Sequence, residues 1–228
     1  MSEATRGFFC AATKAELWTL DLSAAQELET DRLWKIPEGF AAVTGVGIPA
    51  TLISLLPWLE NLRPHWIVNT GIAGGYPGSN LQVGDRVLGI SETFADLGVE
   101  LPDGEGMRPL KAFPFANVFD REPLPLWCPQ NFPVGRDKES IHLAHGATVN
   151  LAAGKFTTGE MRRRLFGADF ESMEGAAVAL AALRNQIPVC EVRCISNLAA
   201  DRDMRPENIS LAVKRLSAFW KLNRSKLP

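Results

Sequence analysis

The sequence of 228 residues has no long hydrophobic run and no excess of one charge. None of its apolar stretches approaches the roughly 20 residues that cross a membrane as a helix. Its first seven residues are polar, and the formal net charge is -2 with both signs spread along the chain. This charge balance argues against a basic nucleic-acid-binding surface and against a polybasic membrane anchor. We therefore expect a cytoplasmic protein that binds neither nucleic acid nor membrane.

The sequence also has no group of residues at metal-ligand spacing. The four cysteines are Cys10, Cys128, Cys190 and Cys194. They lack the close pairing typical of zinc sites, and three of them lie in apolar, strand-like runs, which predicts buried thiols. His142 and His145 stand three residues apart, but no third ligand accompanies them. We therefore expect no metal site.

The composition is that of an ordinary globular domain, because 46% of the residues are hydrophobic and 22% are charged. A chain of this length can bury roughly 70% or more of its unfolded surface. There are no internal repeats, low-complexity tracts or linker-like segments. The sequence therefore predicts one domain over residues 1–228.

Strand-like and helix-like segments alternate along the chain, which implies an α/β fold with a central sheet covered on both faces. The predicted strands are 8–13, 40–44, 65–69, 87–90, 147–153 and 189–195. The predicted helices are 14–20, 49–62, 158–165, a helix capped by Ser172 that runs to Arg184, and 206–222. Residues 22–38 look irregular, with a helical piece at 24–28. Residues 97–136 form a long excursion with some helix, over a site.

Two carboxylates and one polar pair lie at ends of the predicted elements. Glu174 follows Ser172 in the first turn of a helix, where the helix dipole favours negative charge. Glu16 lies just beyond the first strand, and Ser196 and Asn197 end another strand. Such residues are common in the sites of open α/β sheets. A capped helix followed by a strand, or a solvated helix carboxylate, would give the same pattern.

Two glycine-rich segments follow predicted strands. Gly45-Val-Gly47 precedes a helix and could cradle a phosphate, but position 50 is Ala, so the third glycine of a dinucleotide fingerprint is missing. The segment 70–75, which includes Ile72 and Gly74, predicts a tight turn at which the backbone can approach a ligand closely.

Six segments, in order along most of the chain, resemble the purine nucleoside phosphorylase and nucleosidase superfamily. They are Ala-Thr-Lys-Ala-Glu16, Thr-Gly-Val-Gly47, Asn-Thr-Gly-Ile-Ala-Gly-Gly75, Val-Gly-Asp85, Ser-Met-Glu-Gly-Ala-Ala177 and Val-Arg-Cys-Ile-Ser-Asn197. Within it, Gly-Ile-Ala-Gly, Tyr-Pro-Gly-Ser79, Ala-Asp-Leu-Gly98 and the Ser-Asn ending resemble the futalosine hydrolase branch. The resemblance implies a three-layer α/β/α sandwich with a central mixed sheet, a homo-oligomer and no cofactor.

The resemblance also implies a reaction: hydrolysis of the N-glycosidic bond of futalosine, which releases hypoxanthine and dehypoxanthine futalosine in menaquinone biosynthesis. Glu16 matches the general base that activates water, and such a group increases the reaction rate by roughly 10²–10⁴-fold. Glu174 matches the acceptor of the ribose hydroxyls, and its helix-start position is expected to keep it ionised. The other matching residues would contact the sugar or the base: Met173, Ser196, Asn197, Arg193, Ile72, Gly74 and Phe156, the last as a stacking surface.

Two departures from the superfamily pattern predict the specificity. Adenine-specific nucleosidases have Asp where this chain has Asn197, and an Asn amide can donate to N7 or O6 of hypoxanthine whereas an ionised Asp cannot donate. Phosphorylases hold phosphate with an Arg and a Ser, where this chain has Asn69 and Ile72. Water is therefore expected as the nucleophile, and a 6-oxopurine as the leaving group.

Three other interpretations stay open. The chain could be a nucleosidase or phosphorylase for another purine nucleoside, such as methylthioadenosine or inosine. It could bind nucleosides without cleaving them, although the presence of both Glu16 and Glu174 argues against this. An α/β domain with ordinary capped helices would need all six segments to match by chance. For the carboxyphenyl end of futalosine, the excursion offers Phe115, Arg108 and Lys111.

Overall fold

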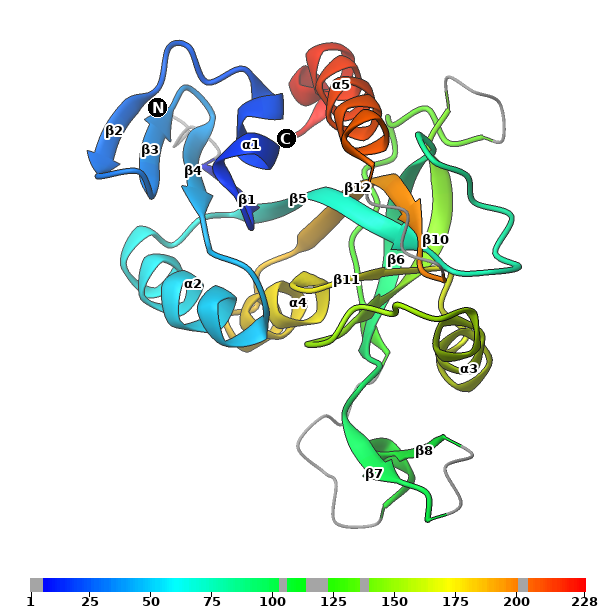
Figure 1. Cartoon of the computed structure of the whole chain (residues 1–228). Helices are drawn as coiled ribbons and strands as arrows, with labels where there is room; N and C mark the ends of the chain where they lie inside the picture. Colours follow the sequence, from blue (N-terminus) through cyan, green and yellow to red (C-terminus); the bar gives the residue numbers. More distant parts are fainter. Residues whose placement is uncertain (1–5, 103–105, 114–122, 136–139, 201–204) are drawn as a thin grey trace.

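A computed structural model of the chain describes residues 6–102, 106–113, 123–135, 140–200 and 205–228 (Figure 1). Among these residues, no helix combines the length and the apolar character needed to span a membrane. The same residues contain no group of three or more His, Cys, Asp or Glu placed to hold a metal ion.

A central mixed sheet organises the fold, with its strands in the order β11-β10-β6-β12-β5-β1-β4-β3-β2. The bounds of these strands are β1 Gly7–Ala11, β2 Gln26–Glu29, β3 Leu33–Ile36, β4 Gly39–Val43, β5 Trp66–Gly75, β6 Arg86–Phe94, β10 His142–Thr148, β11 Phe170–Ser172 and β12 Val189–Leu198. Strands β4, β1, β5 and β12 are parallel, and β12 pairs antiparallel with β6. Because β11 also pairs with the end of β5, the strands β5, β12, β6, β10 and β11 form a closed ring of pairings.

Helices pack on both sides of strand β1 of this sheet. The described helices are α1 Lys14–Leu17 with the 3₁₀ turn η1 Trp18–Leu20, α2 Ile48–Leu62, α3 Phe156–Phe166, α4 Gly175–Arg184, and α5 Pro206–Asn223 with the 3₁₀ turn η4 Arg224–Lys226. Proline occupies the first turn of both α2 and α5, where its missing N–H is not needed. Helix α3 ends at Gly167, whose positive φ suits a C-terminal cap.

The core lies on the two sides of the sheet because side chains alternate along β1. Phe9 packs in a cluster with α1 and α5, whereas Phe8 packs in a second cluster with α2 and α4. Both phenylalanines are fully buried, and each such burial stabilises the fold by roughly 1.5–3 kcal/mol. Helices α2 and α4 therefore hold one face of β1, and α1 and α5 hold the other.

The structure confirms most predicted elements and corrects several. Residues 22–38 contain the hairpin β2–β3 instead of a helical piece, and the strand predicted at 147–153 lies at 142–148. The segment 70–75 is not a tight turn but the end of the long strand β5. Ser172 ends the unpredicted strand β11, and Glu174 instead occupies the N-cap position of α4.

The excursion contains short elements. They are β7 Gly98–Glu100, β8 Met107–Pro109, the 3₁₀ turn η2 Leu110–Ala112 and β9 Leu124–Pro125. Strands β7 and β8 pair with each other and project away from the central sheet, whereas β9 pairs with β6 (Figure 1). The predicted thiols Cys10, Cys190 and Cys194 are buried, which confirms that expectation.

Candidate functional site

A cavity of about 340 Å³ lies where several strands of the sheet end. Its walls come from the segment after β1, the end of β5, the segment between β11 and α4, and the end of β12, with α5 contributing apolar side chains. Ligands of open α/β sheets bind at the carboxyl ends of parallel strands. The cavity is therefore the candidate site.

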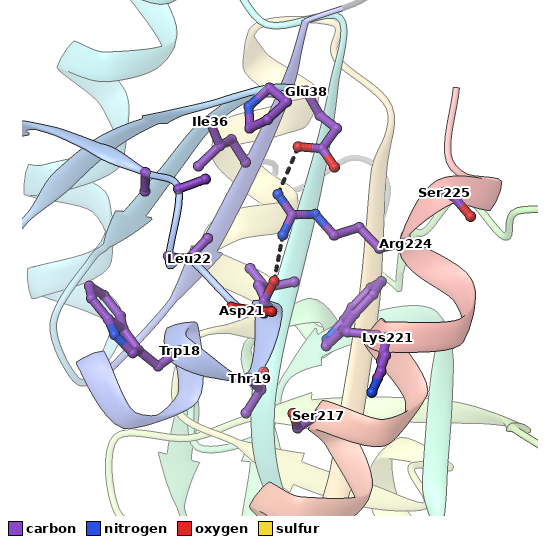
Figure 2. A pocket seen from close by; sticks show the side chains of 15 residues that line it. Trp18, Thr19, Asp21, Leu22, Ile36, Glu38, Ser217, Lys221, Arg224 and Ser225 are labelled. Carbon is purple, nitrogen blue, oxygen red and sulfur yellow. Dashed lines mark hydrogen bonds and ion pairs between the residues drawn. The ribbon is translucent and has the colours of Figure 1, made fainter.

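A larger hollow of about 690 Å³ lies between η1 and α5 (Figure 2). Its principal cation, Arg224, is already held by the Leu20 carbonyl and by Glu38, whose Oε2 lies 2.7 Å from Arg224 Nη2. Arg224 and Glu38 are therefore already paired with each other. The smaller cavity is the stronger candidate because buried polar side chains converge on it.

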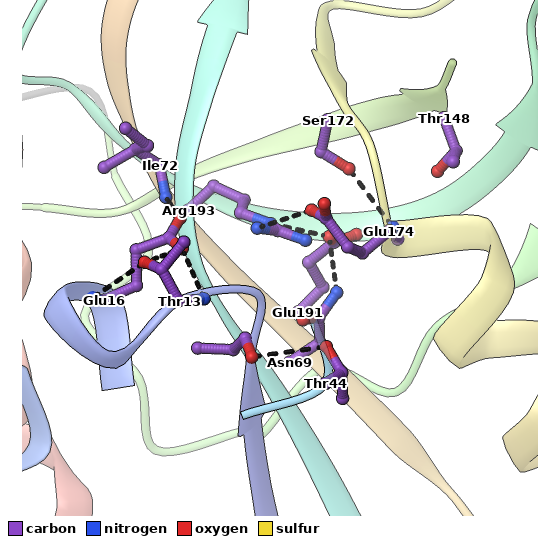
Figure 3. Close-up of polar contacts among 12 residues, drawn as sticks. Thr13, Glu16, Thr44, Asn69, Ile72, Thr148, Ser172, Glu174, Glu191 and Arg193 are labelled. Carbon is purple, nitrogen blue, oxygen red and sulfur yellow. Dashed lines mark hydrogen bonds and ion pairs between the residues drawn. The ribbon is translucent and has the colours of Figure 1, made fainter. Parts of the chain in front are cut away.

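Glu16 enters the cavity as part of a capping box at the start of α1. Its Oε2 accepts hydrogen bonds from the Thr13 backbone N–H (3.1 Å) and from the Thr13 hydroxyl (2.6 Å) (Figure 3). Its Oε1 accepts from the backbone N–H of Ile72 (2.9 Å). The carboxylate is thus fixed in one orientation, and the residue is only 7% exposed.

Gly71 gives Glu16 the room it occupies. A Cβ at position 71 would lie 2.5 Å from Glu16 Oε1 and 2.5 Å from Arg193 Nη1. The glycine in β5 is therefore required by close packing against two charged groups, and not by the tight turn that the sequence predicted. Glu16 and Arg193 thus both pack against the backbone at position 71.

Glu174 lies across the cavity from Glu16 and is held by two groups. Its Oε1 accepts from the backbone N–H of Gly47 (3.0 Å), and its Oε2 lies 3.7 Å from Arg193 Nη1 (Figure 3). Gly47 has a φ of 88°, which a residue with a side chain rarely adopts. Burial raises the pKa of Glu174, and Arg193 and the Gly47 N–H oppose that rise. Burial therefore opposes the ionised state that the helix-start position was expected to favour, whereas Arg193 and the Gly47 N–H support it.

Arg193 does not line the cavity but lies fully buried beneath it. Its Nε donates to Glu191 Oε1 at 2.9 Å, and the same oxygen accepts from Asn69 Nδ2 at 3.1 Å. Neighbouring carboxylates, Glu191 first, raise the pKa of Arg193 against the opposing effect of burial. Asn69 is thereby bonded to Glu191, and it does not line the cavity.

Asn197 presents its amide at the cavity wall formed by the end of β12. Its Oδ1 lies 3.0 Å from Ser196 Oγ, which can donate there, and its Nδ2 donates to the Leu198 carbonyl (3.1 Å). An amide nitrogen carries two hydrogens. One of them is used by Leu198, and the other remains available to an acceptor in the cavity. A Cβ on Gly74 would meet Nδ2 at 3.2 Å, so the bare glycine gives this amide space.

The structure brings most of the predicted site residues together. Seven of them line the cavity: Glu16, Ile72, Gly74, Met173, Glu174, Ser196 and Asn197. Phe156 does not, because it begins α3 with 52% of its surface exposed. Arg108 stacks over Phe113 at 4.7 Å in the projecting hairpin region. Phe115 lies outside the described residues, as does the side chain of Lys111.

Several residues of the site were not predicted from the sequence. Ile209 and Val213 on α5 supply an apolar wall, which only the apolar face of that helix could have signalled. Glu171 also lines the cavity and is held by Arg162 (3.2 Å) and by the Ala153 N–H (2.7 Å). Glu191 could have been suspected because it is a carboxylate among the apolar residues Val189, Cys190 and Val192 of β12.

Comparisons with known proteins give three findings. The model of the phosphorylase superfamily matches residues 34–222. Futalosine hydrolase of Streptomyces coelicolor is 33% identical over 68% of this chain and 63% of that protein, and futalosine hydrolase of Acidothermus cellulolyticus is 32% identical over 76% and 70%. The chain thus spans less than two thirds of the Streptomyces relative. A crystal structure of a putative 5′-methylthioadenosine/S-adenosylhomocysteine nucleosidase from Francisella philomiragia has a TM-score of 0.79 at 17% identity, covers 98% of this chain and 100% of that one, and so supports the fold alone.

Proposed function

The chain belongs to the phosphorylase superfamily, and from that premise we propose that it hydrolyses the N-glycosidic bond of futalosine. The products are hypoxanthine and dehypoxanthine futalosine. Relatives named futalosine hydrolase, 32–33% identical over most of the chain, support this substrate. The resemblance of Tyr-Pro-Gly-Ser79, Ala-Asp-Leu-Gly98 and the Ser-Asn ending to the same branch agrees with them.

The observation that carries the proposal is the combination of side chains in one cavity. Three carboxylates, Glu16, Glu171 and Glu174, and the amide of Asn197 line it, whereas no Lys or Arg does so among the described residues. A phosphate dianion would therefore meet carboxylates without a facing cation. Water is the better nucleophile for such a site.

In the proposed reaction, the bond from the ribose C1′ to the base breaks, and its electron pair leaves with the base, which takes up a proton from solvent and departs as neutral hypoxanthine. The sugar becomes oxocarbenium-like, and a water oxygen bonds to C1′ while Glu16 takes its proton. Glu16 has the fixed orientation that a general base needs, because three donors hold it. Glu174 accepts hydrogen bonds from the ribose hydroxyls, and Met173 packs against the sugar.

Asn197 supports a 6-oxopurine as the leaving group. Its free Nδ2 hydrogen can be donated to N7 or O6 of hypoxanthine, both of which are acceptors. The 6-amino group of adenine is a donor, so the same amide would pair with it less well. Methylthioadenosine, on which related nucleosidases act by their names, is therefore the weaker substrate, and inosine remains an alternative.

We further infer that residues 1–228 form one three-layer α/β/α domain, since α1 and α5 pack on one face of the sheet and α2 and α4 on the other. We also propose a homo-oligomer. The exposed apolar side chains Ile53 on α2 (76%) and Val46 at the cavity (55%) support this proposal. Light scattering of the purified protein measures its mass in solution and tests it.

The test of function measures free base released from futalosine, inosine and methylthioadenosine, with and without phosphate. We expect hypoxanthine from futalosine, at a rate that phosphate does not change and that Glu16→Gln lowers by about 10²–10⁴-fold. Faster release of adenine from methylthioadenosine would contradict the proposed base specificity. Turnover that requires phosphate would contradict hydrolysis.

A further inference from the structure

We propose that Glu92 and Glu191, two carboxyl groups buried beneath the cavity, carry one proton between them and that this proton resides on Glu92. Glu191 is thereby kept as the anion that orients Arg193 toward Glu174. Both are positioning residues and neither lines the cavity. The catalytic consequence depends on the proposed function, whereas the location of the proton is a property of the folded protein.

The two carboxyl groups lie close together on neighbouring strands. Glu92 is in β6 and Glu191 is in β12, strands that pair antiparallel, and the two residues are 0% and 1% exposed. A Cβ on Gly175 would lie 2.4 Å from Glu92 Oε1 and 2.8 Å from Glu191 Oε1. A Cβ on Gly146 would lie 2.0 Å from Glu92 Oε1. The glycine backbones of α4 and β10 thus pack directly against these carboxyl groups.

The hydrogen bonds identify which of the two acids is ionised. Glu191 Oε1 accepts from Arg193 Nε (2.9 Å) and from Asn69 Nδ2 (3.1 Å), so a cation and an amide stabilise its charge. Glu92 Oε2 accepts only from a hydroxyl, that of Thr148 (2.7 Å), among the contacts of the described residues. Oxygens Oε1 of Glu92 and Oε2 of Glu191 have no other donor there. A proton on Glu92 Oε1, donated to the Glu191 carboxylate, removes this deficit.

The charges around Glu92 favour the same assignment. Glu191 and Arg193 face it from β12, and Thr148 on β10 is uncharged. Burial, the charge of Glu191 and the hydrogen bond between the two carboxyl groups raise the pKa of Glu92 well above its ordinary value. One arginine already faces Glu191, Glu174 and Glu16. Two carboxylates this close cannot both ionise without another cation.

The neutral acid has a consequence for the site. With Glu191 bonded to Nε, the guanidinium of Arg193 keeps Nη1 directed to Glu174 Oε2 at 3.7 Å. Thr148, the partner of Glu92, also accepts the N–H of Ala176 at 2.6 Å, in the first turn of the helix that Glu174 precedes. An ionised Glu92 would compete for Arg193 and would raise the pKa of Glu174 further. A neutral Glu92 thus helps to keep Glu174 ionised, as its proposed role of accepting hydrogen bonds from the ribose hydroxyls requires.

The test compares two matched substitutions, Glu92→Gln and Glu191→Gln. Infrared difference spectra at neutral pH are expected to show the C=O stretch of a buried protonated carboxylic acid in the wild type and to lose it in Glu92→Gln. For futalosine, kcat/KM of Glu92→Gln should fall by less than about tenfold, since a neutral hydrogen bond replaces a neutral one. In Glu191→Gln it should fall by roughly 10–100-fold, because Arg193 loses a charge-assisted hydrogen bond.

Three results would overturn the proposal: no protonated-acid band in the wild type, a band that persists in Glu92→Gln, or a Glu92→Gln protein that folds or reacts worse than Glu191→Gln. A thermal melt of each variant detects the folding defect. If the wild type hydrolyses no nucleoside, the proposed function fails, and the infrared comparison still decides where the proton lies.

Discussion

Replacing Gly71 with alanine should impair the reaction by displacing Glu16, and the added Cβ would also lie 2.5 Å from Arg193 Nη1. A Cβ at this position lies 2.5 Å from Glu16 Oε1, which must retreat by about 1 Å before ordinary van der Waals contact at 3.4 Å is restored. That retreat lengthens the hydrogen bond from the Ile72 N–H, now 2.9 Å. A misplacement of about 1 Å can lower a rate by about 10²-fold, and overpacking costs about 1–3 kcal/mol of stability.

The assay is kcat/KM for hypoxanthine release from futalosine, measured for Gly71→Ala, Glu16→Gln and the double variant. If Gly71 acts through Glu16, the double variant should be no slower than Glu16→Gln, because neighbouring residues of one unit are not additive. Gly154→Ala is the matched control, since a Cβ there meets no atom within 4 Å. Wild-type kcat/KM in Gly71→Ala, or losses that multiply in the double variant, would refute the reasoning.

Three further substitutions test other parts of the site. Glu174→Gln should lower kcat/KM but raise the melting temperature at neutral pH. Burial raises the pKa of Glu174 in the folded protein. The contribution of Glu174 to stability is therefore present below the ordinary glutamate pKa and is lost as pH rises through the raised value. Melts of both proteins across acid and neutral pH check the sign, and an equal pH dependence would contradict it. Asn197→Asp should shift the preference from futalosine toward adenine nucleosides, as a substrate panel would measure; an unchanged preference would count against the role of the amide. Arg162→Met should destabilise the fold by about 3–5 kcal/mol, because it leaves the buried Glu171 carboxylate without its cation, whereas the exposed Arg164→Met should change denaturant unfolding little.

Local patterns were sufficient for the elements whose signals lie within a few residues. Four elements lie where the sequence predicts them: the strand before Thr13, the helices α2 and α5 with proline in their first turns, and the strand β12. The strand β10 was misplaced because its first half carries exposed and half-exposed residues around His142, without a continuous apolar run. Hairpin β2–β3 was missed because every residue of β2 is exposed, so no alternation marks it.

The sequence by itself determined the α/β class, the family and the residue types of the cavity, because motifs such as Ser-Met-Glu174 and Ser-Asn197 carry them locally. Tertiary structure decided which of these residues meet. It removed Phe156 from the cavity, placed Arg193 beneath it and turned the 70–75 segment into a strand end. It also brought Glu92 to Glu191, since two carboxylates on strands distant in sequence become neighbours only when β6 pairs with β12. Burial, and with it the protonation of such groups, is a property of the folded chain, so no local pattern could reveal it.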